Sequence, residues 1–256
     1  MRMKSYGGGT GYSIKTENGR ERYCPERDTV LPDEVEHIYP DYGLYPELTK
    51  DRAFGFLTRG CPRSCAFCHV ATKEGRVSRK VADLSEFWCG QKEIVLCDPN
   101  LLACGGHMEL LEQLAASGAR VEFNQGLDVR LMTEANLEVL KRIRLKNVHL
   151  AFDRYQDWDP VTRKLRMFRE ATGLERHTVS VYVLVNFDTT LSQDLERIYF
   201  IRSIGFQPYV MIYDKGNAPA VIRKLQRWTN RPPLFWSIPR FEAYSRLSDE
   251  EREEIK

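Results

Sequence analysis

Three cysteines, Cys61, Cys65 and Cys68, form a C-x-x-x-C-x-x-C run, which is the strongest chemical signal in the chain. Closely spaced thiolates are soft ligands that favour an iron–sulfur cluster or zinc. A four-iron cluster held by three thiolates keeps one iron without a protein ligand, much as a catalytic zinc site keeps one position for water or substrate. The run therefore predicts a metal centre with an open coordination position, where chemistry can take place.

A structural zinc site is the main alternative, with His69 or a distant cysteine as the fourth ligand. Zinc sites usually combine two C-x-x-C pairs, and this chain has no second pair. The spacings of the other cysteines match no common ligand run, which disfavours a second cluster. A disulfide framework is disfavoured because the total of seven cysteines is odd. The four cysteines outside the run are Cys24, Cys89, Cys97 and Cys104.

The overall composition is that of an ordinary soluble globular protein. The 256 residues are 42% hydrophobic and 29% charged, with a net charge of +2. This small charge gives no overall basic surface for nucleic acid. We find no apolar run that could cross a bilayer and no signal-peptide core at the N-terminus. Together with the unpaired cysteines, these features predict a protein of the reducing cytoplasm without membrane association.

The chain divides into three parts by composition. Residues 1–50 contain a glycine run at 7–11 and four spaced prolines, which predict an irregular N-terminal extension. Residues 51–216 are regular and predict the main domain. Residues 217–256 predict a helical segment that covers one side of it.

Within the main domain, short apolar runs alternate with amphipathic helical stripes. We expect six strands, at residues 53–57, 93–97, 120–124, 147–152, 179–185 and 208–213. Thr133 and the Thr190–Gln193 pair indicate helix starts, and Gly118 and Gly205 indicate helix ends. Ser248 and Glu251 form a further capping box before a short C-terminal helix.

This alternation predicts an α/β fold: a parallel sheet covered by helices on its outside. Six β/α units fit a partial (β/α)6 barrel of the TIM type. In such sheets function lies at the carboxyl ends of the strands. The cysteine run immediately follows the first predicted strand, so motif and position agree.

Residues 52–215 resemble the radical S-adenosylmethionine superfamily in the first strand, the cysteine run with an aromatic Phe67 before its last cysteine, and the later β/α units. The resemblance implies a 4Fe-4S cluster on Cys61, Cys65 and Cys68, with S-adenosylmethionine chelating the open iron. It also implies an external one-electron reductant such as flavodoxin or ferredoxin. The cofactor is then cleaved to methionine and a 5′-deoxyadenosyl radical, which takes a hydrogen atom from substrate.

The resemblance also places cofactor contacts at strand ends. Phe67 is placed near the adenine, with an ordinary core aromatic as an equal alternative. Asp98 and Asn100 stand where many members carry a Gly-Gly-Glu motif that meets the methionine amino group; this chain lacks that motif. A strand-end turn is the alternative for the Asp-Pro-Asn run that contains both.

The third strand leads into a second polar run. Arg130 is expected to pair with the methionine carboxylate, and Gln125 or Asp128 to reach the ribose hydroxyls. A structural ion pair between Asp128 and Arg130 is the alternative. Asp153 and Asp214, at the ends of later strands, are weaker candidates.

The N-terminal motifs resemble the end of the cobalamin-binding-type domain that precedes many radical enzymes, which implies a short relative lacking most of that domain. No D-x-H-x-x-G motif for a cobalamin-ligating histidine occurs, so cobalamin is not predicted. The substrate is not identified, and a small molecule, a peptide or a nucleic acid all fit. These N-terminal motifs are residues 8–12, 31–32 and 40–46.

A different class of function, a non-catalytic zinc or iron–sulfur module that contacts nucleic acid, needs exposed aromatic side chains among basic ones. The C-terminal segment is the place where the sequence offers them, although the same residues can instead cover the open edge of the sheet. They are Arg227, Trp228, Arg231, Phe235 and Trp236.

Overall fold

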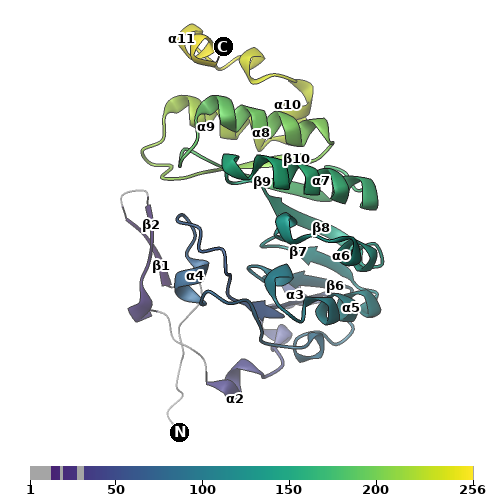
Figure 1. The fold of residues 1–256 in the computed structure, drawn as a ribbon. Helices are drawn as coiled ribbons and strands as arrows, with labels where there is room; N and C mark the ends of the chain where they lie inside the picture. The colour runs from purple at the N-terminus through teal and green to yellow at the C-terminus, as the bar shows by residue number, and fades with distance from the viewer. Residues whose placement is uncertain (1–12, 18–19, 28–31, 256) are drawn as a thin grey trace.

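A computed structural model describes residues 13–17, 20–27 and 32–255. Its centre is a six-stranded sheet, in which every paired strand is parallel to its neighbour, in the order β10-β9-β8-β7-β6-β3 (Figure 1). All six predicted strands are confirmed, with small shifts at their ends. The strands are β3 (Arg52–Gly55), β6 (Glu93–Leu96), β7 (Arg120–Phe123), β8 (Arg144–Ala151), β9 (Val179–Val185) and β10 (Gln207–Ile212).

The helices follow the strands in chain order, as the α/β prediction required. The structure confirms the cap at Thr133, the capping box of Thr190 with Gln193, and the end of α5 at Gly118, which has φ 64°. Helix α6 ends earlier than the apolar pattern predicts, because the chain enters β8 at residue 144. The helices are α5 (His107–Ser117), α6 (Glu134–Leu140), α7 (Trp158–Thr172), α8 (Leu191–Ser203) and α9 (Ala220–Thr229).

The two faces of the sheet differ in character. Side chains such as Val121, Leu150 and Val181 are fully buried in the core that the helices complete. The residues between them, such as Glu122 and Tyr182, are partly accessible and polar or amphipathic. Since side chains alternate between faces along a strand, one face is the core and the other is a separate surface.

The N-terminal region contains a small hairpin and short helical turns rather than long elements. Tyr42 ties it to the sheet: its hydroxyl donates to the Phe87 carbonyl at 2.7 Å and accepts from the Phe54 amide at 2.9 Å. The glycine run at 7–11, part of the predicted irregular extension, lies outside the described residues. The elements are β1 (Ile14–Glu17), β2 (Arg20–Tyr23), η1 (Pro25–Arg27), α2 (Asp33–Glu36), η2 (Tyr42–Leu44) and α3 (Pro46–Thr49).

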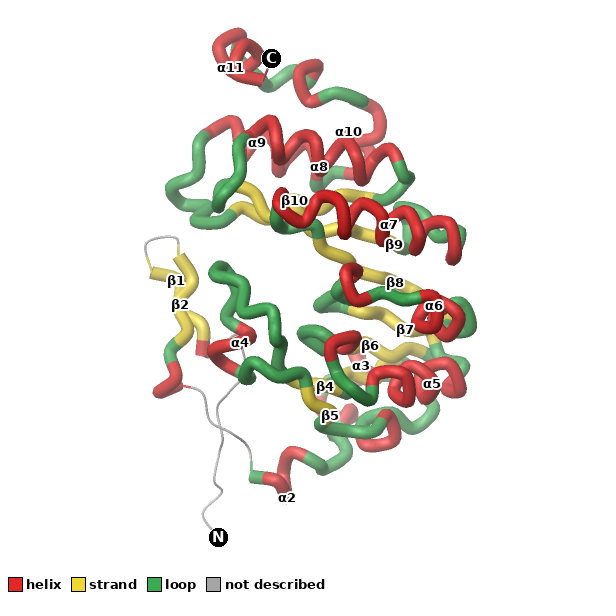
Figure 2. Tube along the Cα trace, viewed as in Figure 1, coloured by secondary structure: helices red, strands yellow, loops and turns green. Residues whose placement is uncertain are grey.

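The connection from β3 to β6 holds the cysteine run. In Figure 2 its loop and α4 lie on the left of the sheet, whereas α5 and α6 lie on the right. The shorter elements near the strand ends, which carry many of the polar residues discussed below, are β4 (Thr58–Arg59), α4 (Val70–Lys73), β5 (Arg79–Lys80), η3 (Leu84–Glu86), η4 (Leu101–Ala103), η5 (Val129–Leu131) and η6 (Tyr155–Asp157).

The C-terminal segment packs its aromatic side chains inward. Trp228 and Phe235 are fully buried, and the Trp236 indole donates to Gln207 of β10 at 2.8 Å. The buried rings of Trp228 and Phe235 therefore have no free face for stacking on a base. The capping box of Ser248 and Glu251 is confirmed. The elements are α10 (Pro232–Ser237), η7 (Phe241–Ala243) and α11 (Asp249–Ile255).

Across residues 13–17, 20–27 and 32–255, none of the helices combines the length and the apolar character needed to span a bilayer.

A buried arginine on α8 fixes the carboxyl ends of two strands. The Arg197 guanidinium is fully buried and donates to the carbonyls of Phe152, Asp153 and Leu184 at 2.7 to 2.9 Å. Its charge is balanced by Asp194 at 2.5 Å. A buried charge is tolerated when it is paired and hydrogen-bonded, and here it orders the chain at the carboxyl ends of β8 and β9.

At the opposite ends of the strands, Glu93 joins neighbouring strands. Its carboxylate accepts from Arg52 at 2.9 Å and Lys146 at 2.7 Å and is ion-paired with Arg120. The hydrogen bond from Lys146, helped by Arg120, outweighs burial and lowers the pKa of Glu93 to about 2.

We predict that Glu93→Gln lowers the free energy of unfolding by about 1–3 kcal/mol at pH 7, since hydrogen bonds to a charged group are lost. Because the pKa of Glu93 is depressed on folding, its stabilising effect is present above pH about 4.5 and is lost as the pH falls towards about 2. Urea unfolding followed by circular dichroism at pH 7 and pH 3 measures this. The matched control is Glu138→Gln, at an exposed helical carboxylate. An equal loss in the two variants would contradict the role of Glu93.

Candidate functional site

The cysteine run is anchored at its start by Asp98, which follows β6. The buried Asp98 carboxylate accepts from the amides of Leu57 and Thr58 and from the Thr58 hydroxyl, at 2.5 to 3.2 Å. Burial raises the pKa of Asp98 to about 6 against the effect of these bonds. The carboxylate thus holds the chain just before the cysteines. Because its oxygens are used in this way, we give Asp98 a positioning role.

Gly60 lets the loop fold back on itself immediately before Cys61. It has φ 87°, and a Cβ built on it would lie 2.2 Å from the Val77 carbonyl oxygen. A side chain at this position is therefore excluded both by backbone conformation and by space. The Cys61 amide then donates to the Gly75 carbonyl at 3.1 Å, which closes the loop.

The three thiols of the run are free and lie at the mouth of this loop. Cys61 and Cys65 are half-buried and Cys68 is exposed. Burial raises the pKa of the Cys65 thiol, and the positive charge of Arg130 opposes this. Within the described part of the chain, no three Cys, His, Asp or Glu side chains are arranged as ligands of one metal ion.

The donor set and its surroundings nevertheless suit an iron–sulfur cluster. The buried Asn100 amide nitrogen donates to the Cys61 sulfur at 3.4 Å, a contact of the kind that tunes cluster thiolates. The other amide atom of Asn100, Oδ1, is buried and has no hydrogen-bond partner in the described residues. A polar atom of this kind beside a candidate cysteine ligand suits a site built for more than packing.

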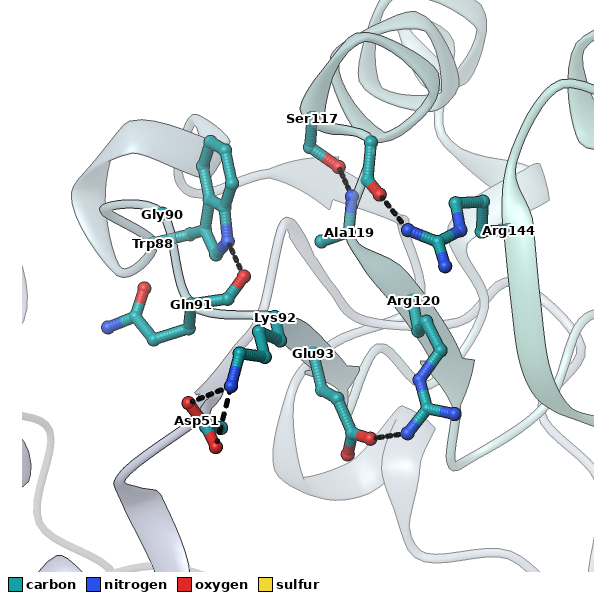
Figure 3. A pocket seen from close by; sticks show the side chains of 11 residues that line it. Asp51, Trp88, Gly90, Gln91, Lys92, Glu93, Ser117, Ala119, Arg120 and Arg144 are labelled. Carbon is teal, nitrogen blue, oxygen red and sulfur yellow. Dashed lines mark hydrogen bonds and ion pairs between the residues drawn. The ribbon is translucent and has the colours of Figure 1, made fainter.

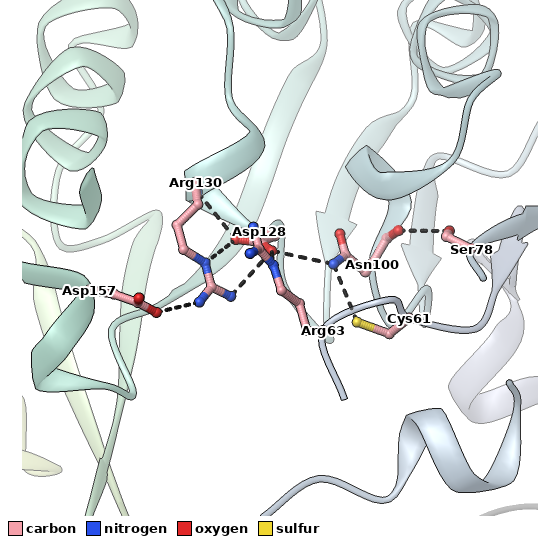
Figure 4. Close-up of polar contacts among 7 residues, drawn as sticks. All are labelled: Cys61, Arg63, Ser78, Asn100, Asp128, Arg130 and Asp157. Carbon is pink, nitrogen blue, oxygen red and sulfur yellow. Dashed lines mark hydrogen bonds and ion pairs between the residues drawn. The ribbon is translucent and has the colours of Figure 1, made fainter. Parts of the chain in front are cut away.

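Asp128 is the hub that connects the cysteine loop to the strand ends (Figure 4). Its carboxylate, 7% exposed, accepts from Arg63 of the loop and from Arg130, both at 2.7 Å, and lies 3.4 Å from the Asn100 amide. Burial alone raises the pKa of Asp128, but its bonds to Arg130 and Arg63 outweigh this and hold the pKa below its ordinary value. Arg130 continues the network to Asp157 at 2.6 Å.

A small pocket lies next to Cys65. Phe67 and Arg130 line it, together with Ala151 of β8 and three charged residues that follow β8: Asp153, Arg154 and Asp157. Burial raises the pKa of Asp153 to about 6, and its carboxylate accepts from the Leu184 amide at 3.1 Å.

The structure therefore brings together most of the predicted site residues. Asn100, Asp128 and Arg130 form one network, and Phe67 and Arg130 share the pocket with Cys65. The alternative of an ion pair between Asp128 and Arg130 is confirmed. Gln125 is exposed and belongs to no contact described here.

Sequence reasoning assigned no role to Arg63, Arg154 or Asp157. Arg63 had one usable signal, since it is a charged residue inside the cysteine run. Arg154 and Asp157 follow β8 without a recognisable pattern, and they reach the site because the strands around them are adjacent.

A larger cavity of about 610 Å³ lies at the amino ends of β6 and β7, away from the cysteines (Figure 3). Its charged side chains already have partners: Lys92 with Asp51, Arg120 with Glu93, and Arg144 with the Gly118 carbonyl. In parallel α/β sheets function lies at the opposite, carboxyl ends, so we do not regard this cavity as the active site.

A comparison with protein-family models and a search of curated proteins found no match to this chain.

We predict that Asp128→Asn releases the cysteine loop, because Arg63 loses its carboxylate partner. Trypsin cleavage between Arg63 and Ser64, followed by mass spectrometry, should become at least severalfold faster. Asp157→Asn is the matched control, since Asp157 is ion-paired with Arg130 and not with Arg63. Equal cleavage rates in both variants and the unchanged protein would rule out the anchoring role of Asp128.

Proposed function

We propose that this protein is a radical S-adenosylmethionine enzyme with a 4Fe-4S cluster on Cys61, Cys65 and Cys68. The observation that carries the proposal is the buried Asn100 amide donating to the Cys61 sulfur, in a loop with three free cysteines at the carboxyl side of the first sheet strand. The C-x-x-x-C-x-x-C spacing without a second C-x-x-C pair favours a cluster over zinc.

When bound, the cluster supplies the electron that cleaves S-adenosylmethionine to methionine and a 5′-deoxyadenosyl radical, which removes a hydrogen atom from substrate. The chain itself orients these groups and limits water. Asp98 and Gly60 fix the path of the cysteine loop, and Asp128 holds Arg63 of that loop against the strand ends.

The pocket beside Cys65 suggests which side chains hold S-adenosylmethionine. Phe67 offers a ring edge for the adenine, and Asn100 Oδ1 offers an acceptor for the methionine ammonium. Arg130 is already bound by two carboxylates. Arg154 lines the same pocket and has no carboxylate partner among the described residues, so we assign it the methionine carboxylate.

Two ring contacts support a partial barrel rather than a flat sheet. Phe67, which follows β3 at one sheet edge, packs on Phe187, which follows β9, with ring centroids 5.5 Å apart. Phe187 in turn packs on Tyr213 after β10, at 4.8 Å. Neighbouring strands are about 4.8 Å apart, so in a flat sheet the side chains that follow β3 and β9 would be too far apart to touch. Their contact therefore favours a curved sheet whose edges approach each other.

The reductant in this proposal is an external one-electron carrier such as flavodoxin or ferredoxin. The exposed position of Cys68 fits an electron entering from outside the chain.

We predict that anaerobically reconstituted protein contains four irons and four sulfides per chain, absorbs visible light, and produces 5′-deoxyadenosine with dithionite. Cys65→Ala should lose both the cluster and the product, because two thiolates under-ligate the cluster. Cys89→Ala, at an exposed cysteine outside the loop, should keep both. Stoichiometric zinc without a cluster, or a cluster that never cleaves the cofactor, would refute the proposal.

We predict that Arg154→Ala weakens S-adenosylmethionine binding by about tenfold or more, because a charge-assisted hydrogen bond is lost. The iron content should stay unchanged. Arg163→Ala, at an exposed arginine on α7, is the matched control. Equal affinity of the Arg154 and Arg163 variants, measured by equilibrium dialysis, would exclude the assigned contact.

A further inference from the structure

The sheet face opposite the core carries a continuous group of polar and aromatic side chains. Glu122 of β7 is in register with Asn147 of β8, and Tyr182 of β9 is in register with Tyr209 of β10. His149 lies between these two pairs on the same face of β8. They alternate with the fully buried Val121, Val148, Val181 and Val210, so they point away from the core.

The aromatic members form one group of contacting rings on this surface. The rings of His149 and Tyr182 are stacked, with centroids 5.0 Å apart and planes within 8°. Tyr209 packs edge-on against Tyr182 at 5.6 Å and remains 45% exposed. A ligand ring placed on such a surface gains stacking energy of about 1–3 kcal/mol.

Beside this surface lie polar atoms that have no hydrogen-bond partner among the described residues. The contacts of Glu122 with Asn147, at 3.0 Å, and Lys146, at 3.7 Å, both involve Oε2, and in the described residues Oε1 has no partner. The His149 Nδ1 atom is buried and also has no partner there. Burial lowers the pKa of His149 below its ordinary value, so its ring is neutral and Nδ1 can donate or accept.

Lys146 lies beside Glu122, but its main ion pair is with another carboxylate. A shift in register between Val121 and Glu122 places Lys146 as an extra residue in β8. Lys146 makes its shorter contact, 2.7 Å, with Glu93. Glu122 therefore keeps an acceptor oxygen for a ligand N–H group.

The surface is adjacent to the candidate active site. Ala151 lies two residues beyond His149 on the same face of β8 and is in register with Tyr182. It also lines the pocket that contains Cys65 and Phe67. A ring held on His149 thus lies next to that pocket, with the small side chain of Ala151 between them.

We propose that this face binds a planar nitrogen heterocycle of the nucleobase type that carries an exocyclic amino group. The ring stacks on the face of His149 that Tyr182 does not cover, and its amino group donates to Glu122 Oε1. Carboxylates are suited to the amino group of cytosine in this way. That the bound base is the molecule attacked rests on the function proposed above; the binding itself does not.

The test uses the purified full-length chain and nucleosides that differ in one amino group: cytidine against uridine, and guanosine against inosine. Adenosine is avoided because S-adenosylmethionine contains it. In equilibrium dialysis, at least one amino-bearing nucleoside should bind about tenfold or more tightly than its partner, and S-adenosylmethionine should not displace it.

Variants locate the binding. Glu122→Gln should remove the preference within each pair, and Tyr209→Leu, at an exposed position that tolerates change, should weaken both members severalfold. Tyr45→Leu, at an exposed tyrosine of the N-terminal region, is the matched control and should bind normally. Tyr182→Phe keeps the stack and should keep the preference.

Equal affinity within both pairs, no nucleoside binding, or binding of N-acetyltryptophanamide in place of nucleosides would overturn the inference; the last would indicate a peptide. The two proposals fail separately. Cofactor cleavage without nucleoside binding removes the assignment of this face, whereas nucleoside binding without a cluster removes the radical chemistry and leaves the binding site standing.

Discussion

The Asp128 carboxylate is the interaction on which the candidate site depends. It joins Arg63, inside the cysteine run, to Arg130 and Asn100, which follow two different strands. A short loop with three thiols has no core of its own to hold it. Its position relative to the strand ends is therefore set by buried charge-assisted hydrogen bonds. Removing one partner of such a bond leaves the other charge buried and unpaired.

The two ends of the sheet use charge for different purposes. At the amino ends, Glu93 joins Arg52, Arg120 and Lys146 into a closed network that stabilises the strands. At the carboxyl ends, the network leaves groups with unused capacity, including Arg154 and Asn100 Oδ1. Satisfied charges indicate structure, and unsatisfied polar atoms at the functional end of a parallel sheet indicate a ligand.

The same contrast separates the two faces of the sheet. The helix side is an apolar core with complete packing. The other side carries Glu122, His149 and Tyr182 at positions where a simple covered sheet needs only apolar residues. A carboxylate and an imidazole beside stacked rings incur a desolvation cost there, which a bound polar ring can offset. In the functions proposed here, cofactor chemistry and base recognition occupy neighbouring surfaces.

The sequence by itself determined the six strands, the helix caps and the triad of thiols, because these follow from local periodicity, capping chemistry and ligand spacing. Only the tertiary structure decided how the polar residues are used. Asp98 bonds to backbone amides forty residues earlier, and Arg154 and Asp157 reach the site from an adjacent strand. Such partners are set by strand order and burial, which bring together residues that no spacing along the chain connects.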